Sequence, residues 1–353
     1  MGGARVLVLC LIAACGSDSG GANPDGGPGP ADGSPSGGDG GGGGGGGLVA
    51  SGITPRIIGV DDRHVYWSHW LGGGLFRAPQ EGGAVEILIP DGEKTSDGVV
   101  AAGGLLYVHT SCETSIGGIC RMPAEGGPLE LVHHGGNGQG LTVIDGAVYW
   151  ASYDGAHGVD EAGEAVDLSP YDSDLTQFGV VGEHLYIREL DGIARVEIGP
   201  DAEPPVWFAS APNPLGLKSD GEYLYWFDIV AAEGGGPLTT IRRKRLDSAV
   251  AASAEEAEPG EPLLSLERVL APFAFEVADE GVYFVFFQST SGTPGGRGSL
   301  ARIPREGGEM TVLAPDQPGP QDIALTAEHV FVSSLGTCTD QPDCSGRIVR
   351  VPR

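Results

Sequence analysis

The chain has 353 residues, and its 48 acidic and 20 basic side chains give a formal net charge of −28 at pH 7. A field of that sign repels nucleic acid and anionic lipid, so we exclude both as partners; the charge otherwise indicates a solubility device, with a cationic partner as the alternative. Without the N-terminal segments described next, about 306 residues remain, enough for one large closed domain or two ordinary ones.

Residues 1–15 predict an export signal. Arg5 supplies a positive charge, and the apolar run that follows is about nine residues long, too short to span a bilayer. The run ends in LIAAC at residues 11–15, which resembles a bacterial lipobox. That resemblance implies that Cys15 is acylated after cleavage and, because no aspartate directly follows it, that the lipoprotein is sorted to the outer membrane. An ordinary signal peptide with an incidental cysteine is the alternative.

Residues 16–47 predict a disordered tether. The segment consists almost wholly of glycine, proline, serine and aspartate and ends in a glycine run from Gly40, so it has very little apolar surface to bury. A glycine-rich coil of this length spans roughly 30 Å. We assign residues 48–353 to one folded domain.

From Ile57 onward a unit of four short strands and three turns recurs. In its first copy, residues 57–88, apolar and polar residues alternate with a period of two, and Asp and Gly residues mark the turns. Four third strands close on Arg-x-Pro, and proline marks a strand end. The second strand of each unit carries an aromatic residue in the same place: Tyr66, Tyr107, Tyr149, Tyr186, Tyr225, Tyr283 and Phe331.

A four-strand repeat of roughly 40 to 45 residues is the signature of a β-propeller blade. Seven copies predict an all-β, seven-bladed propeller with four-stranded antiparallel blades; a two-sheet sandwich is the alternative. The seventh copy stops after its third strand. We therefore expect residues 48–53 to supply its fourth strand and close the ring, which removes an open edge.

The run VYWSHWLGGGLFRAP at residues 65–79 resembles the Tyr-Trp-Thr-Asp propellers of lipoprotein-receptor type and, more loosely, the TolB-like and NHL propellers. The resemblance covers residues 48–353 and implies the propeller fold. Trp67, Trp150 and Trp226 follow the tyrosine in three units and are expected in the core. Only Asp228 matches the family's motif aspartate, so the family's binding roles are not carried over.

Four cysteines lie in the domain, in two close pairs. Cys112 with Cys120 and Cys338 with Cys344 fall between the second and third strands of units two and seven. In an exported chain this spacing predicts two disulfides. A metal site that joins all four is the alternative.

The loops between second and third strands and the connections between units are long and varied, so we expect the functional face there. Asp172 and Asp174 suggest calcium, with an ion-free acidic loop as the preferred interpretation and no cofactor expected. Residues 316–322 predict a rigid turn around two prolines. The candidate ligand-face residues, each with an ordinary solvated or packed role as the alternative, are Trp70, His133, His134, Asn137, Gln139, Asp154, His157, Tyr171, Asp172 and Asp174.

Unit five is the irregular copy. Its third strand is the basic run at residues 241–246, and residues 249–262 insert an Ala- and Glu-rich stretch. We expect a flexible acidic excursion whose glutamates neutralise the arginines, which leaves no anion site.

The sequence lacks a Gly-x-Ser-x-Gly elbow, a His-Glu-x-x-His helix, a complete phosphate loop and a dinucleotide fingerprint. We expect a non-catalytic, monomeric cell-envelope lipoprotein whose propeller binds or scaffolds a protein or glycan partner and meets the membrane only through its lipid anchor. The alternative is a propeller lyase or hydrolase acting on envelope polysaccharide or a small lactone-like substrate through carboxylates and His133 or His134. Two carboxylates within about 10 Å at a central pocket would favour that alternative.

Overall fold

The computed structural model describes residues 46–353 except 70–72, 91–94, 111–117, 135–138, 145–146, 153–154, 161, 167, 169–177, 200–202, 233–236, 268–273, 288–295 and 337–345. The predicted signal, Cys15 and nearly all of the tether lie outside the described residues. Residues 44–353 form one compact unit. Its regular elements are all β-strands, and within this part of the chain no helix is long and apolar enough to cross a membrane.

The strands form seven small antiparallel sheets that follow one another along the chain. Blade 1 has β2 (Pro55–Val60), β3 (His64–His69), β4 (Gly73–Pro79) and β5 (Glu86–Ile89). Blade 2 has β6 (Thr95–Ala102), β7 (Leu105–Thr110), β8 (Gly118–Pro123) and β9 (Glu130–His134). Blade 3 has β10 (Gln139–Ile144), β11 (Ala147–Ser152) and β12 (Gly155–Val159).

The remaining four blades complete the order. Blade 4 has β13 (Phe178–Val181), β14 (His184–Arg188), β15 (Gly192–Glu197) and β16 (Val206–Ser210). Blade 5 has β17 (Pro214–Ser219), β18 (Tyr223–Ala231), β19 (Pro237–Arg245) and β20 (Glu261–Glu267). Blade 6 has β21 (Phe275–Ala278), β22 (Gly281–Phe287), β23 (Arg297–Ile303) and β24 (Thr311–Pro318). Blade 7 has β25 (Pro320–Leu325), β26 (His329–Ser334), β27 (Gly346–Pro352) and β1 (Gly47–Ile53).

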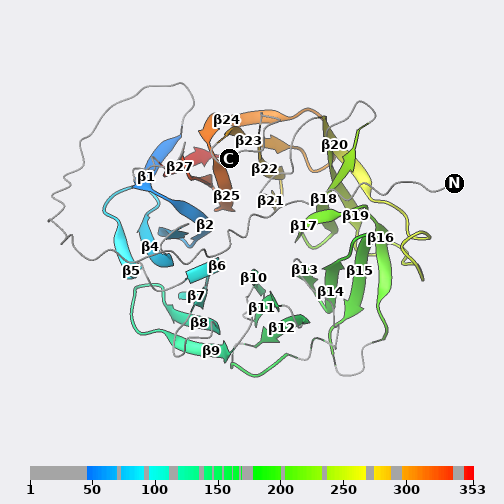
Figure 1. Ribbon diagram of the computed structural model, residues 1–353, viewed down its shortest axis with the longest axis horizontal. Helices are drawn as coiled ribbons and strands as arrows, with labels where there is room; N and C mark the ends of the chain where they lie inside the picture. The colour runs from blue at the N-terminus through cyan, green and yellow to red at the C-terminus, as the bar shows by residue number, and fades with distance from the viewer. Residues whose placement is uncertain are drawn as a thin grey trace, which may run out of the picture. The chain divides into compact units, whose positions relative to one another are not determined.

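The seven sheets stand in a ring with the first strand of each innermost (Figure 1). This arrangement confirms the predicted seven-bladed propeller. The repeated aromatic residue lies in the second strand of each blade, as expected. Six of the seven copies are buried, and Tyr149 of blade 3 is partly buried. Trp67, Trp150 and Trp226 are at most 1% exposed, which confirms their place in the core.

The N-terminal strand closes the ring, as predicted. Strand β1 pairs antiparallel with β27, from Gly47 opposite Arg350 to Ile53 opposite Gly346. Val49, Ala50 and Ile53 are buried in a core cluster that they share with blade 1. The outermost strand of the last blade therefore comes from the opposite end of the domain from the other three.

Blade 3 departs from the expected four strands. Its described sheet has three strands, β10, β11 and β12. A short return follows β12: Val159 forms an isolated bridge with Ala165, and the Val166 amide donates to the Gly158 carbonyl at 2.9 Å. A rudimentary fourth segment thus stands where the other blades have a full outer strand.

A repeated arginine ties the blades together. It lies opposite the aromatic residue on the third strand, and in three blades its own neighbour on the fourth strand is a glutamate. In blade 5, Arg243 Nε donates to Glu261 at 3.1 Å, and a terminal nitrogen donates to the Arg305 carbonyl of blade 6 at 2.6 Å. Arg77 of blade 1 likewise donates to Glu86 and to the Ala124 carbonyl of blade 2. The full set on the third strands is Arg77, Arg121, Arg195, Arg243, Arg302 and Arg350.

The basic run of blade 5 is internally neutralised, as expected. Arg243 pairs with Glu261 and Arg245 with Glu222, and Arg242 pairs with Asp228, an aspartate instead of the expected glutamate. These three arginines therefore all form ion pairs within their own blade.

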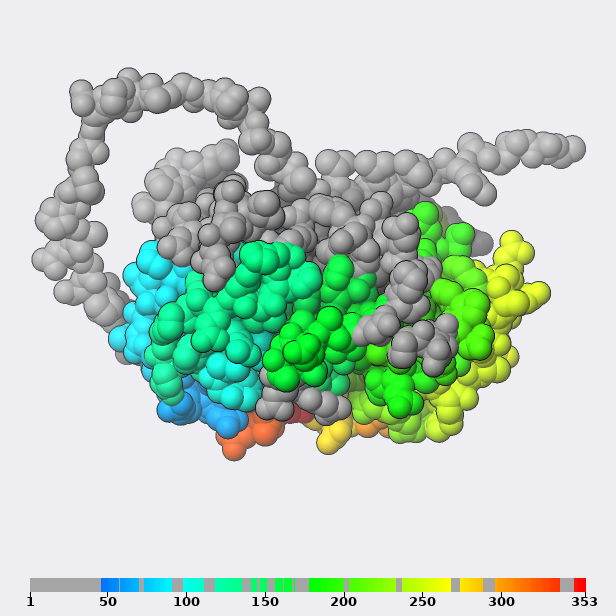
Figure 2. Space-filling model, turned by 90° about the horizontal axis from the view of Figure 1, so that it is seen from below, coloured from blue at the N-terminus to red at the C-terminus, as the bar shows by residue number. Residues whose placement is uncertain are grey.

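The insertion of blade 5 is packed, so the expected flexible excursion was wrong. Ala251 and Trp207 exchange two backbone hydrogen bonds of 2.9 Å, and Ser210 forms a bridge with Pro259. The buried Lys244 Nζ donates to the carbonyls of Phe208 and Glu258 at 2.7 and 3.3 Å. In Figure 2 the yellow surface of this segment lies beside the green surface of blade 4. The insertion covers the outer strand of blade 4, which otherwise would be an open sheet edge.

We expect deletion of residues 46–53 to lower the melting temperature and the urea midpoint markedly, because it removes β1 and exposes β27. The milder change Ile53→Ala should cost about 2 to 5 kcal/mol of unfolding free energy. Thermal and urea unfolding followed by circular dichroism measure both effects. Deletion of residues 16–45 is the control and should leave both midpoints unchanged. An unchanged midpoint after loss of β1 would contradict closure by this strand.

Candidate functional site

The innermost strands place one residue of each blade opposite the repeated aromatic, on the same face of the sheet. Five of these seven positions carry small or uncharged residues, and blades 5 and 6 carry charges. The set in chain order is Gly59, Val100, Thr142, Gly179, Lys218, Glu276 and Ala324. The two charged residues therefore face one another from adjacent blades at the centre of the ring.

Lys218 and Glu276 form an ion pair between β17 and β21. The Lys218 Nζ donates to Glu276 Oε1 at 2.6 Å. Burial lowers the pKa of Lys218, but Glu276 and then Asp322 more than offset this, so the pKa is raised and the ammonium stays charged. The side chains are still 43% and 29% exposed. The pair lies deep among the inner strands and is nevertheless reached by solvent.

Asp322 adds a second carboxyl group from blade 7. It lies within β25, so the rigid turn predicted for this region was wrong: Gly319 alone separates β24 from β25. Asp322 Oδ2 accepts a hydrogen bond from the Ile58 amide of blade 1 at 3.1 Å, and Oδ1 accepts one from the Ile323 amide at 2.9 Å. The Ser333 hydroxyl donates a hydrogen bond to the Arg56 carbonyl at 3.2 Å and accepts one from the Asp322 amide. These bonds join the last blade to the first.

Burial raises the pKa of Asp322 to about 7, and nearby Glu276 acts in the same direction. The Ile58 amide and Lys218 oppose the shift without cancelling it. We call Lys218, Glu276 and Asp322 the axial cluster. It has a fixed ion pair beside a carboxyl whose charge changes near neutral pH, so it suits a ligand that brings hydrogen-bond donors or a positive charge.

Two predicted ligand-face residues come together between blades 2 and 3. The rings of His133 on β9 and His157 on β12 are 5.6 Å apart, and each lies within 6 Å of the buried Trp150 ring, at 4.9 and 5.7 Å. His133 and His157 are partly buried, whereas His134 is exposed. The structure thus joins two of the predicted residues through a core tryptophan.

The other predicted ligand-face residues cannot be placed. The backbone of Gln139 lies at the start of β10, but its side chain is outside the description. Trp70, Asn137, Asp154, Tyr171, Asp172 and Asp174 lie outside the described residues. The roles assigned to them therefore stay predictions.

Three of the four cysteines predicted to form disulfides or a metal site also lie outside the described residues. Cys120 is fully buried in β8. Cys112, Cys338 and Cys344 fall in the gaps between β7 and β8 and between β26 and β27, outside the described residues, so both predicted disulfides stay predictions. Among the residues that can be placed, no group of three or more His, Cys, Asp or Glu side chains is arranged to hold a metal ion.

The motif aspartate has a structural position. Asp228 is 2% exposed and accepts a hydrogen bond from Trp226 Nε1 at 2.8 Å while it pairs with Arg242. Trp67 and Trp150 lack a partner for the same indole nitrogen within the described part of the chain. Asp228 is thus committed to holding the core tryptophan of blade 5.

No known protein-family model matches the chain, and no curated protein matches it. Solved structures do match. YCF48 bound to D1 peptide shares 11% identity over 86% of this chain and 95% of that chain, with a TM-score of 0.55. The extracellular domain of BT4673 from B. thetaiotaomicron shares 8% over 86% and 39%, with a TM-score of 0.50. BamB from Moraxella catarrhalis shares 15% over 85% of each chain, with a TM-score of 0.45. The first two likenesses, with TM-scores of 0.55 and 0.50, confirm the resemblance to propellers at the level of fold alone.

The pKa of Asp322 predicts a pH-dependent stability. Its folded-state pKa of about 7 lies above the ordinary 3.8, so the stability it contributes is complete below pH 3.8 and is lost as pH rises through 7. We expect the melting temperature of the wild type to fall relative to that of Asp322→Asn across this interval. Asp316→Asn, at a 65% exposed aspartate, is the control and should give a constant difference. A constant difference for Asp322→Asn as well would contradict the shifted pKa.

Proposed function

We propose that the protein is a non-catalytic binding module of the cell envelope, lipid-anchored through Cys15, whose ring receives a protein or glycan partner at its axis. The axial cluster is the observation that carries the proposal. Lys218 and Glu276 are charged, solvent-accessible and fixed on inner strands, where the equivalent residues of the other blades are uncharged. Charged groups held on a rigid frame give a partner its orientation and specificity.

A peptide segment is the partner that we favour. YCF48, a match with the same fold, was solved with a peptide bound. An extended peptide offers backbone amide donors, and a basic one also offers positive charge. Both complement the carboxylates of Glu276 and Asp322, while Lys218 is suited to a peptide carbonyl or carboxylate. The net charge of −28 favours a basic segment over an acidic one.

A propeller hydrolase or lyase is the second candidate, and one observation favours it. Glu276 and Asp322 interact electrostatically, and the pKa of Asp322 is raised to about 7. A carboxyl group with a raised pKa beside a second carboxyl group can supply an acid and a base in one site. Glu276→Gln should abolish hydrolysis of a polysaccharide or lactone if this function holds, and should leave peptide binding reduced but present if it does not.

A charge exchange tests the binding function. The double variant Lys218→Glu with Glu276→Lys keeps the net charge and the ion pair but reverses its direction. We expect immobilised wild-type protein to retain a partner from envelope extracts that the exchanged variant loses, as measured by quantitative mass spectrometry.

The matched control exchanges an ion pair on outer strands. Arg121 and Glu130 of blade 2 are joined at 3.1 Å and are 36% and 62% exposed. The variant Arg121→Glu with Glu130→Arg should retain the same partner as the wild type. Retention of no partner by wild-type protein, or equal retention by the axial variant, would contradict binding at the axis.

A further inference from the structure

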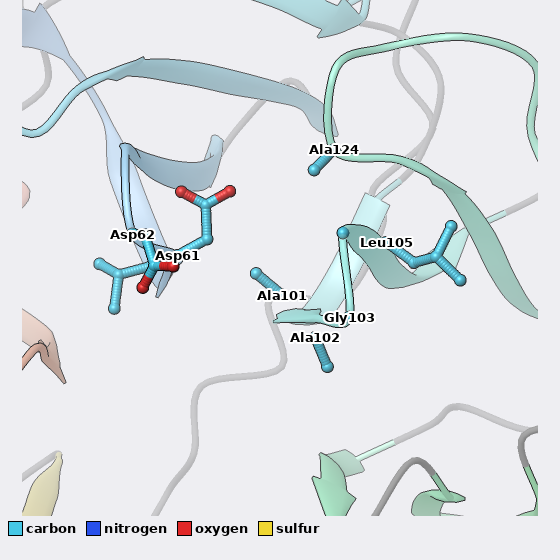
Figure 3. Close-up of a pocket in the computed structure, with 9 residues that line it drawn as sticks. Asp61, Asp62, Ala101, Ala102, Gly103, Leu105 and Ala124 are labelled. Atoms are coloured by element: carbon cyan, nitrogen blue, oxygen red, sulfur yellow. The ribbon is translucent and has the colours of Figure 1, made fainter.

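A hollow lies between blades 1 and 2 on the short-turn face, the face formed by the turns from first to second and from third to fourth strands. Its volume is about 390 Å³, within the range of small-molecule sites, about 300 to 1,000 Å³. Asp61 and Asp62, in the turn between β2 and β3, lie on one side, and Ala101, Ala102 and Gly103 of blade 2 face them together with Ala124 (Figure 3). Small residues on the blade 2 side create the space, and carboxylates line the blade 1 side.

The same turn recurs in blade 5, where its aspartate is bound by an arginine. Asp220 accepts hydrogen bonds from the Glu222 and Tyr223 amides at 2.9 and 2.8 Å and from the Tyr225 hydroxyl at 2.7 Å. Arg305 of the next blade completes the site: it pairs with Asp220 Oδ2, and its Nε donates to the Tyr225 hydroxyl at 3.4 Å. Asp220 is consequently only 6% exposed.

Blade 6 repeats the arrangement with a glutamate. Tyr283 donates to Glu280 Oε1 at 2.5 Å, and Arg353 of blade 7 donates to both Glu280 oxygens at 2.6 and 2.5 Å. The Arg353 hydrogen bond is the largest cause of the fall in the pKa of Glu280 to about 2. Two blades thus use one device: a turn carboxylate and a tyrosine hydroxyl that hold a guanidinium from the following blade.

Blade 1 has the carboxylate and the tyrosine but lacks the guanidinium. Asp61 accepts the Arg63 and His64 amides at 2.8 and 2.7 Å and the Tyr66 hydroxyl at 2.6 Å, which reproduces the pattern around Asp220. The residue that follows the Arg-x-Pro proline is Arg305 in blade 6 and Arg353 in blade 7, but it is Ala124 in blade 2. Asp61 is accordingly 25% exposed.

The backbone around this position is the same in the two cases. Arg77 donates to the Ala124 carbonyl just as Arg243 donates to the Arg305 carbonyl. The side chain differs, so the hollow beside Asp61 stands in the place that the Arg305 side chain takes three blades earlier in the ring. Asp62 lies at the mouth, is exposed and has no ion-pair partner among the residues that the structure describes.

We propose that this hollow binds an arginine side chain of a partner protein, whose guanidinium pairs with Asp61 and Asp62 as Arg305 pairs with Asp220. The site lies on the short-turn face, so it goes beyond the proposed axial function and stands independently of it. A guanidinium suits the site better than an ammonium because its planar fork can bond a carboxylate and a hydroxyl oxygen at once. The nearby Arg63 leaves the site available, since it pairs with Glu125.

The first test supplies the arginine within the chain. In the full-length protein, Ala124→Arg should refill the hollow and raise the melting temperature. Combined with Asp61→Asn, the same substitution should give no such rise. Ala124→Met is the control that fills volume without charge, and any effect it has should not depend on Asp61. A rise that is equal with and without the Asp61 carboxylate would overturn the assignment.

The second test supplies the arginine from solution and needs no core substitution. N-acetyl-arginine amide titrated into the full-length wild type should shift the Gly103 and Gly104 amide signals saturably in NMR spectra. Asp62→Asn, at an exposed residue, should weaken this binding by about threefold, the effect of one exposed ion pair, with no change in melting temperature. Ala124→Arg should abolish it. Equal shifts with N-acetyl-lysine amide, or no saturable shift at all, would overturn the proposal.

Discussion

The pairing of β1 with β27 is the constraint on which the rest of this structure depends. A ring of sheets has no edge only if its last sheet is completed, and here that sheet borrows its outer strand from the start of the domain. The closing strand also buries three apolar residues in a cluster that includes blade 1. Closure fixes the positions of all seven inner strands, so side chains from blades that are distant in sequence meet at the axis.

Arginine side chains make repeated contacts between neighbouring blades. Arg77 and Arg243 on third strands bond to the following blade, and Arg305 and Arg353, which come after third strands, bond back to the preceding blade, so these contacts hold neighbouring blades together. Two places differ from their counterparts in other blades. At the axis, Lys218 and Glu276 are charged where the five equivalent residues are not, and between blades 1 and 2 Ala124 stands where blades 6 and 7 have Arg305 and Arg353. Both departures leave a charged group accessible, which is why each supports a proposal.

The fold was largely predictable from sequence because its signals are local. An aromatic residue in the second strand of each unit and turns rich in Gly and Asp mark each blade without knowledge of its neighbours, and Arg-x-Pro marks the end of the third strand in four of them. The missing fourth strand of the last copy also predicted closure. The packing of the insertion at residues 249–262 against blade 4 was not predictable, since it depends on long-range bonds to Trp207 and Ser210 and not on the apolar content of the segment.

The candidate site was much harder to predict. Lys218 and Glu276 are ordinary surface residues in the linear sequence, and only the register of β17 with β18 and of β21 with β22 places them in equivalent positions. An alignment of the seven copies on the tyrosine would have revealed both as exceptions. The prolines around Asp322 favour a turn in the sequence, whereas in the structure Gly319 alone links β24 to β25. His133 and His157 were recognised singly, but their shared contact with Trp150 needs two blades.

The place of β1 at the start of the domain has a mechanical consequence. Any tension carried by the residues before Gly47 enters the domain at the strand that completes blade 7, at the Gly47–Arg350 pair. The ladder between the two chain ends therefore bears that pull before any other sheet does. Ring closure and the junction with the preceding chain meet in one strand, so a force strong enough to peel β1 away from β27 would open the ring.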